Sequence, residues 1–268
     1  MNYQHIYHAG SSADVFKHLT IIALLNCLKQ KEKPFCYIDS HAGNGEYDLL
    51  RSQNQEWQDG IGQLQKYSAK NNLLKQYIEY AQDLHHFPGS PRIAQKLLRP
   101  QDEMILIEKS DQSYQDLKYL FHHQKQAHLH HNDAYISLSA LLPPKIKRGL
   151  VFIDPPYEEK NEFDKLIPLL QDAIKKFSTG IYALWYPIKS RLFIQRFYHD
   201  LKKQFNHCEI LITEFCPWPD DVAIRLNGSG MIIINPPWEL EKTLSPLLKE
   251  LINILKQHPN GFYRMRSV

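Results

Sequence analysis

Residues 150–157, Leu-Val-Phe-Ile-Asp-Pro-Pro-Tyr, decide the fold and the site that we predict for this chain. The four apolar residues predict a strand that is buried on both faces of a sheet. Because neither proline has an N–H to donate, the strand should end at Asp154 in a stiff loop, and such loops at the carboxyl ends of parallel strands bind ligands in open α/β sheets. The Asp154 carboxylate, the Pro155 carbonyl and the flat ring of Tyr157 suit a planar ring that carries an NH2 group. The alternative is a simple turn that Asp154 caps.

The composition is that of an ordinary globular protein. The chain has 268 residues, of which 43% are hydrophobic and 23% charged, and its formal net charge is +3. This charge permits a nucleic-acid partner without requiring one. The four cysteines form no C-x-x-C pair, and the apolar run over residues 19–25 is too short to span a bilayer. We therefore expect a cytoplasmic monomer with reduced thiols, no metal and no membrane anchor.

The first helix is predicted to begin after Ser11, where Ser11 and Asp14 form an S-x-x-D capping signal. Apolar residues recur at helical spacing as far as Leu25, so one face of this helix should pack on a core. Lys17 and His18 lie in its first turns, beside the apolar stripe. Taken alone, His18 is most simply a packing histidine whose hydrogen bonds are satisfied.

A short strand over residues 35–38 leads into a turn that contains His41, Gly43 and Gly45. Glycines in such a turn let the backbone approach a ligand closely. The spacing G-x-G lacks the third glycine of a dinucleotide fingerprint, so it favours a smaller cofactor that carries a nucleoside. We expect His41 to face that ligand.

Residues 49–87 have a helical pattern and predict a small insertion between the first two strands. The insertion would form a subdomain beside a main domain of residues 1–48 and 88–268. Ser90 follows the turn that ends it. This serine is expected to cap the next helix, with Pro91 at the first helical position, and that role is compatible with a contact to a cofactor.

Two further strand ends carry acids that suit a bound nucleoside. A strand over residues 104–107 ends on Glu108, and an acid at the end of the strand after a glycine turn commonly binds the two ribose hydroxyls. A shorter strand over residues 129–134 contains Asp133, which could accept from an adenine amino group; the alternative is a surface turn. Five histidines between residues 122 and 131 match no zinc spacing.

Strands and helices alternate through the rest of the chain, and together the seven strand candidates predict a doubly wound, mostly parallel α/β sheet. The later strands are expected over residues 180–186, 208–215 and 231–234, and the helices over residues 111–121, 163–176, 190–205 and 240–256. The last strand ends in Asn235-Pro236-Pro237-Trp238, a rival to the Asp154 loop. We favour Asp154, because Asn235 cannot accept a proton and because it follows what we predict to be the final strand.

This ordered set of motifs is similar to that of amino-methylating S-adenosylmethionine-dependent methyltransferases. More narrowly, the chain resembles the bacterial 23S rRNA adenine-N6 methyltransferase family, RlmJ. The resemblance rests on blocks that span the chain: His8-Ala9-Gly10, Ala13-Asp14-Val15, Lys17-His18, Asp39-Ser40-His41-Ala42-Gly43 with Gly45 and Tyr47, Pro88-Gly89-Ser90-Pro91, Ile153 to Tyr157, Tyr182 to Pro187, Ser229-Gly230-Met231, and Asn235 to Trp238.

The resemblance implies a Rossmann-like enzyme that methylates the N6 amino group of an adenine in 23S rRNA. Asp154 would be the catalytic acceptor, and the substrate would contact Tyr3, Lys17, Pro155 and Tyr157. From the residues and the resemblance together, the cofactor site would be lined by His18, His41, Gly43, Gly45, Ser90, Glu108, Asp133, Ala134 and Asp154. The alternatives are methylation of DNA adenine or of a protein glutamine amide, and a non-catalytic RNA-binding protein that kept the fold.

Overall fold

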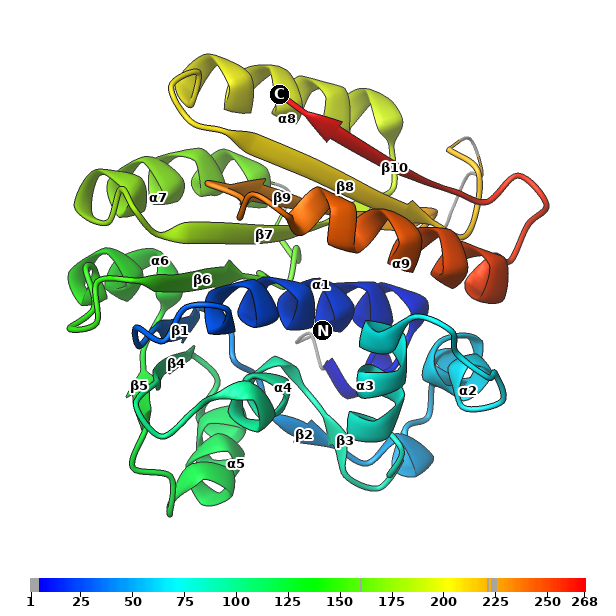
Figure 1. Cartoon of the computed structure of the whole chain (residues 1–268), viewed down its shortest axis with the longest axis horizontal. Coiled ribbons are helices and arrows are strands. Elements are labelled where there is room, and N and C mark those ends of the chain that lie inside the picture. The colour runs from blue at the N-terminus through cyan, green and yellow to red at the C-terminus, as the bar shows by residue number, and fades with distance from the viewer. Residues whose placement is uncertain (1–4, 160, 221, 223–225) are drawn as a thin grey trace.

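The computed structural model describes residues 5–159, 161–220, 222 and 226–268. Within these ranges the chain forms an eight-stranded sheet with the strand order β10-β8-β9-β7-β6-β1-β4-β5 (Figure 1). The strands are β1 Cys36–Asp39, β4 Glu103–Glu108, β5 Ala127–His131, β6 Gly149–Ile153, β7 Ile181–Ile188, β8 Ile210–Cys216, β9 Gly228–Ile234 and β10 Phe262–Ser267. Strands β5, β4, β1, β6 and β7 are mutually parallel, whereas β9 is antiparallel to β7 and β8, and β10 is antiparallel to β8.

The prediction of a doubly wound, mostly parallel sheet is confirmed, but the described chain adds an eighth strand to the seven predicted. Strand β10 lies in the C-terminal tail and pairs with the edge of β8. Its Tyr263 and Met265 pack on the core, whereas Arg264 and Arg266 between and after them are exposed. The alternation is only four residues long and contains two arginines, which is why we expected no strand there.

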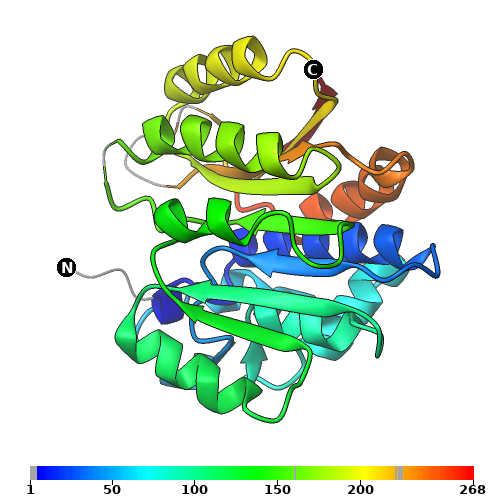
Figure 2. The ribbon, with the colours of Figure 1, turned by 90° about the vertical axis from the view of Figure 1, so that its left-hand side faces the viewer.

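Helices cover both faces of the sheet, as Figure 2 shows for α1 and α9 on one side and α7 and α8 on the other. One core lies under α1 Ser12–Lys29, α4 Ser90–Leu97, α5 Asp111–Phe121 and α9 Leu240–Leu255. The second core lies under α6 Ala134–Ser137, η4 Leu138–Leu141, α7 Glu162–Lys176 and α8 Arg191–Gln204. Side chains of β6 alternate between the two cores, so this strand is buried on both faces as predicted.

Helix α1 is buried on all sides, not on the single face that its apolar spacing predicts. Residues 14–25 are buried without interruption, because α3, α4 and α9 pack against the helix in addition to the sheet. A helix enclosed in this way is normally apolar all round. The burial of the polar residues Asp14, Lys17 and His18 therefore needs an explanation, and their contacts at the candidate site provide it.

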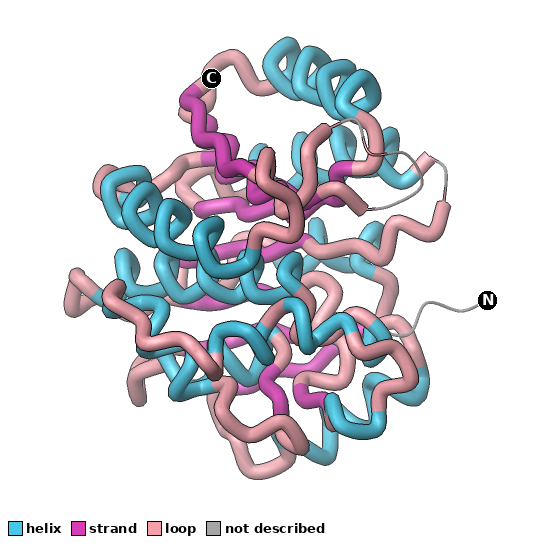
Figure 3. Tube along the Cα trace, turned by 90° about the vertical axis from the view of Figure 1, so that its right-hand side faces the viewer, coloured by secondary structure: helices cyan, strands magenta, loops and turns pink. Residues whose placement is uncertain are grey.

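The segment of residues 49–87 is helical, as predicted, but it consists of short helices separated by turns. It comprises η2 Leu49–Arg51, η3 Glu56–Asp59, α2 Ile61–Leu64 and α3 Asn72–Tyr80, and its ends meet in the antiparallel pair of β2 Glu46–Tyr47 and β3 Phe87–Pro88. Figure 3 views the molecule from the side on which these helices lie. The backbone N–H of Asn71 donates to Glu250 on α9 at 2.9 Å, which ties the segment to the main sheet's helices.

Candidate active site at the carboxyl edge of the sheet

The loop after β6 is held rigidly in place. Strand β6 ends at Ile153, as predicted, and the Asp154 side chain is 14% exposed. Tyr157 has a φ of +52°, a backbone conformation that is costly for a residue with a side chain. Its hydroxyl donates to the Trp185 carbonyl at 2.6 Å and its ring lies 4.9 Å from that of Phe163. These contacts fix the Tyr157 ring against the end of β7.

Lys17 joins helix α1 to the Asp154 loop. Its ammonium lies 2.6 Å from Asp154 Oδ2 and 2.9 Å from Asp14 Oδ1, and it lies 5.2 Å from the centre of the Trp185 ring. Only 5% of Lys17 is exposed. The structure thus brings together two residues that the sequence analysis placed on the acceptor side, and it bonds them directly.

Asp14 is a site residue that sequence analysis missed, because it had been assigned only to helix capping. Its carboxylate is 2% exposed and accepts from the Gly10 N–H at 3.1 Å, with the ring nitrogen Nε2 of His5 3.3 Å away. Burial alone would raise the pKa of Asp14, but Lys17, His5 and His18 hold it well below its usual value. The i,i+3 spacing of Asp14 and Lys17 was the available signal.

His18 packs against aromatic side chains in the core. It is 1% exposed, its Nδ1 lies 3.2 Å from the Tyr77 hydroxyl, and its ring lies 5.9 Å from that of Phe87. Burial lowers its pKa to about 4, although Asp14 opposes the shift. Its contact with a cofactor stays a prediction.

We expect His18 to make the protein less stable in mild acid. The unfolded chain binds a proton at this residue near pH 6.5 and the folded chain only near pH 4. The contribution is therefore intact above pH 6.5 and is lost as the pH falls toward 4, by about 3 kcal/mol. His18→Asn, which can still bond Tyr77, should flatten the pH dependence of urea unfolding over this window. An equally steep dependence in the variant would contradict a neutral buried His18.

The glycine turn after β1 faces the end of β4. Gly43 and Gly45 have φ values of +62° and +78°, and a side chain at Gly43 would lie 2.4 Å from the Tyr47 hydroxyl. Glu108 accepts from the Gly43 N–H and from the Ser110 N–H, each at 2.7 Å. The two predicted cofactor-binding elements are thus in direct contact, with the acid on the backbone of the turn.

Asp133 caps helix α6 and also pairs with a lysine. Its Oδ1 accepts from the Tyr135 N–H at 2.9 Å and its Oδ2 lies 2.8 Å from Lys109 Nζ. Ala134, the first residue of α6, is buried beside it. His41 lies nearby, with its ring centre 6.0 Å from that of Tyr135, and burial lowers its pKa to about 4.

The expectation that Ser90 caps a helix is wrong. Gly89 is the N-cap of α4 and Ser90 is its first residue. The chain approaches the glycine turn so closely here that the Gly89 N–H donates to the Gly45 carbonyl at 2.9 Å. The Ser90 hydroxyl instead lowers the pKa of Asp39, a fully buried acid at the end of β1, whereas burial raises that pKa to about 6.

The four strands β5, β4, β1 and β6 are parallel neighbours, so their carboxyl ends meet at one edge of the sheet. Asp133, Glu108, the glycine turn and Asp154 lie at those ends. Acceptor carboxylates beside a glycine backbone fit a cofactor with ribose hydroxyls and an amino group. Among the described residues, no three histidine, cysteine or acidic side chains gather in a group that could hold a metal ion.

A cavity of about 440 Å³ opens beside Lys17. Its walls include His5, Tyr157 and Trp185 on the Asp154 side, and Trp218 and Leu226 on the far side. The volume is in the range that binds a small organic ligand. Sequence analysis did not single out Trp185 or Trp218 for this wall. Tyr3, which was expected to face the substrate, lies outside the described residues.

The rival loop at Asn235 lies at the opposite edge of the sheet. Strand β9 is antiparallel to β7, so its end lies beside the start of β7, and the Asn235 side chain donates to the carbonyls of Ser178 and Gly180 at 2.9 and 2.8 Å. Our choice of Asp154 agrees with this geometry, but one of its reasons was wrong, because β10 follows Asn235 in the chain.

This fold and its acid-proline-proline-tyrosine loop define a Rossmann-like α/β methyltransferase. A family model described as "Ribosomal RNA large subunit methyltransferase D, RlmJ" matches residues 32–267, and the chain belongs to that family. It is 38% identical to ribosomal RNA large subunit methyltransferase J of Escherichia coli over 92% of this chain and 91% of the relative, and 35% identical to the Haemophilus influenzae protein of that name over 100% and 99%. A crystal structure of a Legionella pneumophila protein, 33% identical, superposes with a TM-score of 0.88 over 97% of this chain and 98% of the other.

Among the described residues, no helix is both long and apolar enough to cross a membrane.

Proposed function

We propose that this protein transfers a methyl group from S-adenosylmethionine to the N6 amino group of an adenine in 23S rRNA. The observation that carries the proposal is the ion pair between Lys17, which lines the cavity, and Asp154, which follows β6. The chain belongs to a ribosomal RNA methyltransferase family. The substrate would place the enzyme in the cytoplasm, where we expect it to act as a monomer.

The residues at the ends of β1, β4 and β5 would hold the cofactor. Glu108 would accept from the ribose hydroxyls and Asp133 from the adenine amino group, and the Gly43–Gly45 backbone, with His41 and Ala134, would pack beside them. Ser90 would act here through Asp39, whose pKa its hydroxyl lowers. When bound, S-adenosylmethionine supplies a methyl group already activated by its sulfonium.

The protein's own task is to position the acceptor amine. The lone pair of the adenine N6 is delocalised into the ring, so the amine is a weak nucleophile. Lys17 anchors Asp154 through Oδ2, which leaves Oδ1 and the Pro155 carbonyl to accept from the two N–H groups and orient the amine. Asp154 would then receive the proton that N6 releases on methylation. Tyr157, fixed by Trp185, would stack on the flipped base.

Glu108→Ala should weaken S-adenosylmethionine binding by about 1.5–3 kcal/mol, the range for hydrogen bonds to a charged group. Loss of the carboxylate also releases the Gly43 N–H that shapes the turn. Calorimetric titration of the variant and of Glu108→Gln measures the effect, and the glutamine variant should lose less because it keeps one acceptor oxygen. If the Kd of S-adenosylmethionine were unchanged in both variants, Glu108 would not bind the ribose.

A further inference from the structure

The acceptor cavity extends well beyond the Asp154 loop. Its far wall includes Trp218, which follows β8, and Leu226, which precedes β9. Lys189, which follows β7 and is exposed, lies on the same cavity. The target amine would occupy only the end near Lys17, so the distant wall has no role in the methyl transfer itself.

Trp218 is held in a fixed orientation at this wall. Its indole N–H donates to the Gln257 side chain at 2.5 Å, and its backbone N–H donates to the Asn227 carbonyl at 3.2 Å. The Gln257 N–H in turn donates to the Pro217 carbonyl at 3.1 Å. The ring is therefore pre-organised, although part of it stays accessible.

A salt bridge anchors residues 214–220, which include Trp218. Arg191, at the start of α8, lies 2.6 Å from Glu214 on β8 and 2.5 Å from Asp220. The Asn227 side chain also donates to the Asp220 carbonyl at 3.0 Å. The wall is thus fastened to the sheet on both sides of Trp218, which is the support that a binding surface needs.

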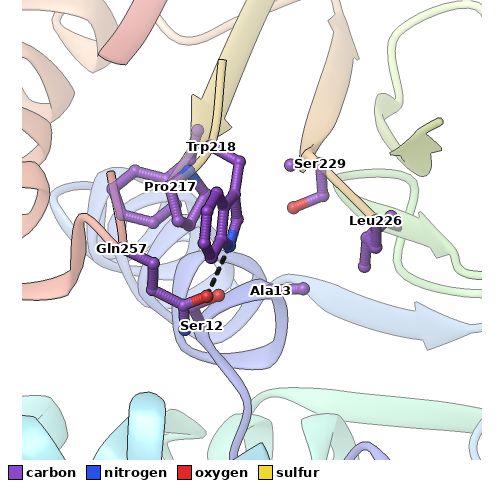
Figure 4. A pocket seen from close by; sticks show the side chains of 9 residues that line it. Ser12, Ala13, Pro217, Trp218, Leu226, Ser229 and Gln257 are labelled. Carbon is purple, nitrogen blue, oxygen red and sulfur yellow. Dashed lines mark hydrogen bonds between the residues drawn. The ribbon is translucent and has the colours of Figure 1, made fainter. Parts of the chain in front are cut away.

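A hollow of about 40 Å³ opens from this wall, with the Trp218 ring on one side and Leu226 on the other (Figure 4). Leu226 is 40% exposed. Ser229 lines the hollow and is fully buried, yet its Oγ has no hydrogen-bond partner among the described residues, and Figure 4 shows it directed into the hollow. A buried hydroxyl of this kind normally has a hydrogen-bond partner, so we expect a water or a polar group of a ligand in the hollow.

We propose that Trp218 and Leu226 form a second nucleotide subsite, which receives the base of a nucleotide next to the target adenine. The inference rests on the proposed function, because it takes single-stranded RNA as the occupant. An aromatic face stacks on any base, a water in the hollow links the base's polar edge to the Ser229 hydroxyl, and Lys189 pairs with the linking phosphate. The subsite holds the strand while its neighbouring base is presented to Asp154.

The test combines Trp218 variants with RNA that lacks single bases. The substrate is a fragment of 23S rRNA that the wild type methylates, used intact and with an abasic residue on one or the other side of the target adenine. Trp218→Ala should raise KM for the intact RNA by about fivefold or more, with kcat and the Kd of S-adenosylmethionine little changed. Trp218→Phe should keep most of the affinity, because it keeps a ring.

The abasic substrates identify the occupant. Removal of one neighbouring base should raise the KM of the wild type by a similar factor and should add nothing further in Trp218→Ala. Trp238→Ala is the matched control, because Trp238 is 85% exposed and follows Asn235 at the opposite edge of the sheet. It should behave as the wild type with every RNA.

Three outcomes would overturn the subsite. An unchanged KM in Trp218→Ala would reduce Trp218 to packing, and so would independent, multiplying effects of the variant and the missing base. If the KM of the wild type were the same for both abasic substrates as for the intact RNA, no neighbouring base would occupy the subsite. If the wild type methylates no RNA at all, the proposed function fails and the subsite fails with it.

Discussion

Asp154→Ala is expected to abolish methyl transfer, with kcat lower by about a hundredfold to ten-thousandfold, the usual range for loss of a positioned acid or base. The affinity for S-adenosylmethionine should change only a few-fold, because Asp154 acts on the acceptor amine. Asp154→Asn should be nearly as inactive, since an amide keeps the shape but cannot take the proton. Single-turnover transfer from labelled cofactor measures the rate, and calorimetry measures the affinity.

Asn235→Ala is the control for this result, because it changes the similar loop at the other edge of the sheet. The variant should methylate at the wild-type rate and lose only stability, about 1 kcal/mol for each hydrogen bond to Ser178 and Gly180. If Asp154→Ala kept most of the activity, or if Asn235→Ala lost it, the Asp154 loop would not be the catalytic loop.

Lys17→Met is expected to impair both stability and activity. The substitution leaves the Asp14 carboxylate, 2% exposed, without the cation 2.9 Å away, and breaking such a buried pair costs about 3–5 kcal/mol. It also frees Asp154 from the contact at 2.6 Å that orients it. Urea unfolding and RNA methylation measure the two effects, and RNA methylation should fall further than cofactor affinity.

A double variant separates the two roles of Lys17. Lys17→Met with Asp14→Asn removes both buried charges, so much of the stability should return. The activity should stay low, because Asp154 still lacks its cation. Recovery of activity together with stability would show that Lys17 acts only by holding the fold together.

The sheet could be predicted because its strands are distinct apolar runs that end in turn or acidic residues. Strand β6 and its proline loop are the clearest case. Strand β10 could not, because an edge strand needs only one apolar face, and Tyr263 and Met265 give a very short pattern. The direction of β9 was also beyond reach, since pairing direction depends on connections across the whole sheet.

The site could be predicted where one residue carried its own chemical signal. Asp154 was assigned to the acceptor side from its own loop, and Lys17 from the family resemblance. Nothing local shows that the first turns of α1 lie beside the loop after β6 and bring the two side chains together. Asp14 had a sufficient local role as a capping residue, which hid its pairing with Lys17. Ser90 was misplaced by one position, because Gly89 is the N-cap of α4 and Ser90 is the first residue of that helix.

The central claim is that this protein methylates adenine N6 in 23S rRNA through Asp154. The most direct measurement is transfer of a labelled methyl group from S-adenosylmethionine to separate preparations of unmethylated 23S rRNA, DNA and protein, followed by digestion of the RNA and chromatography of its nucleosides. We expect label in 23S rRNA alone, as N6-methyladenosine, and no label in any preparation when Asp154→Asn replaces the wild-type enzyme. Label in DNA, in protein glutamine or in another nucleoside, or undiminished transfer by Asp154→Asn, would contradict it.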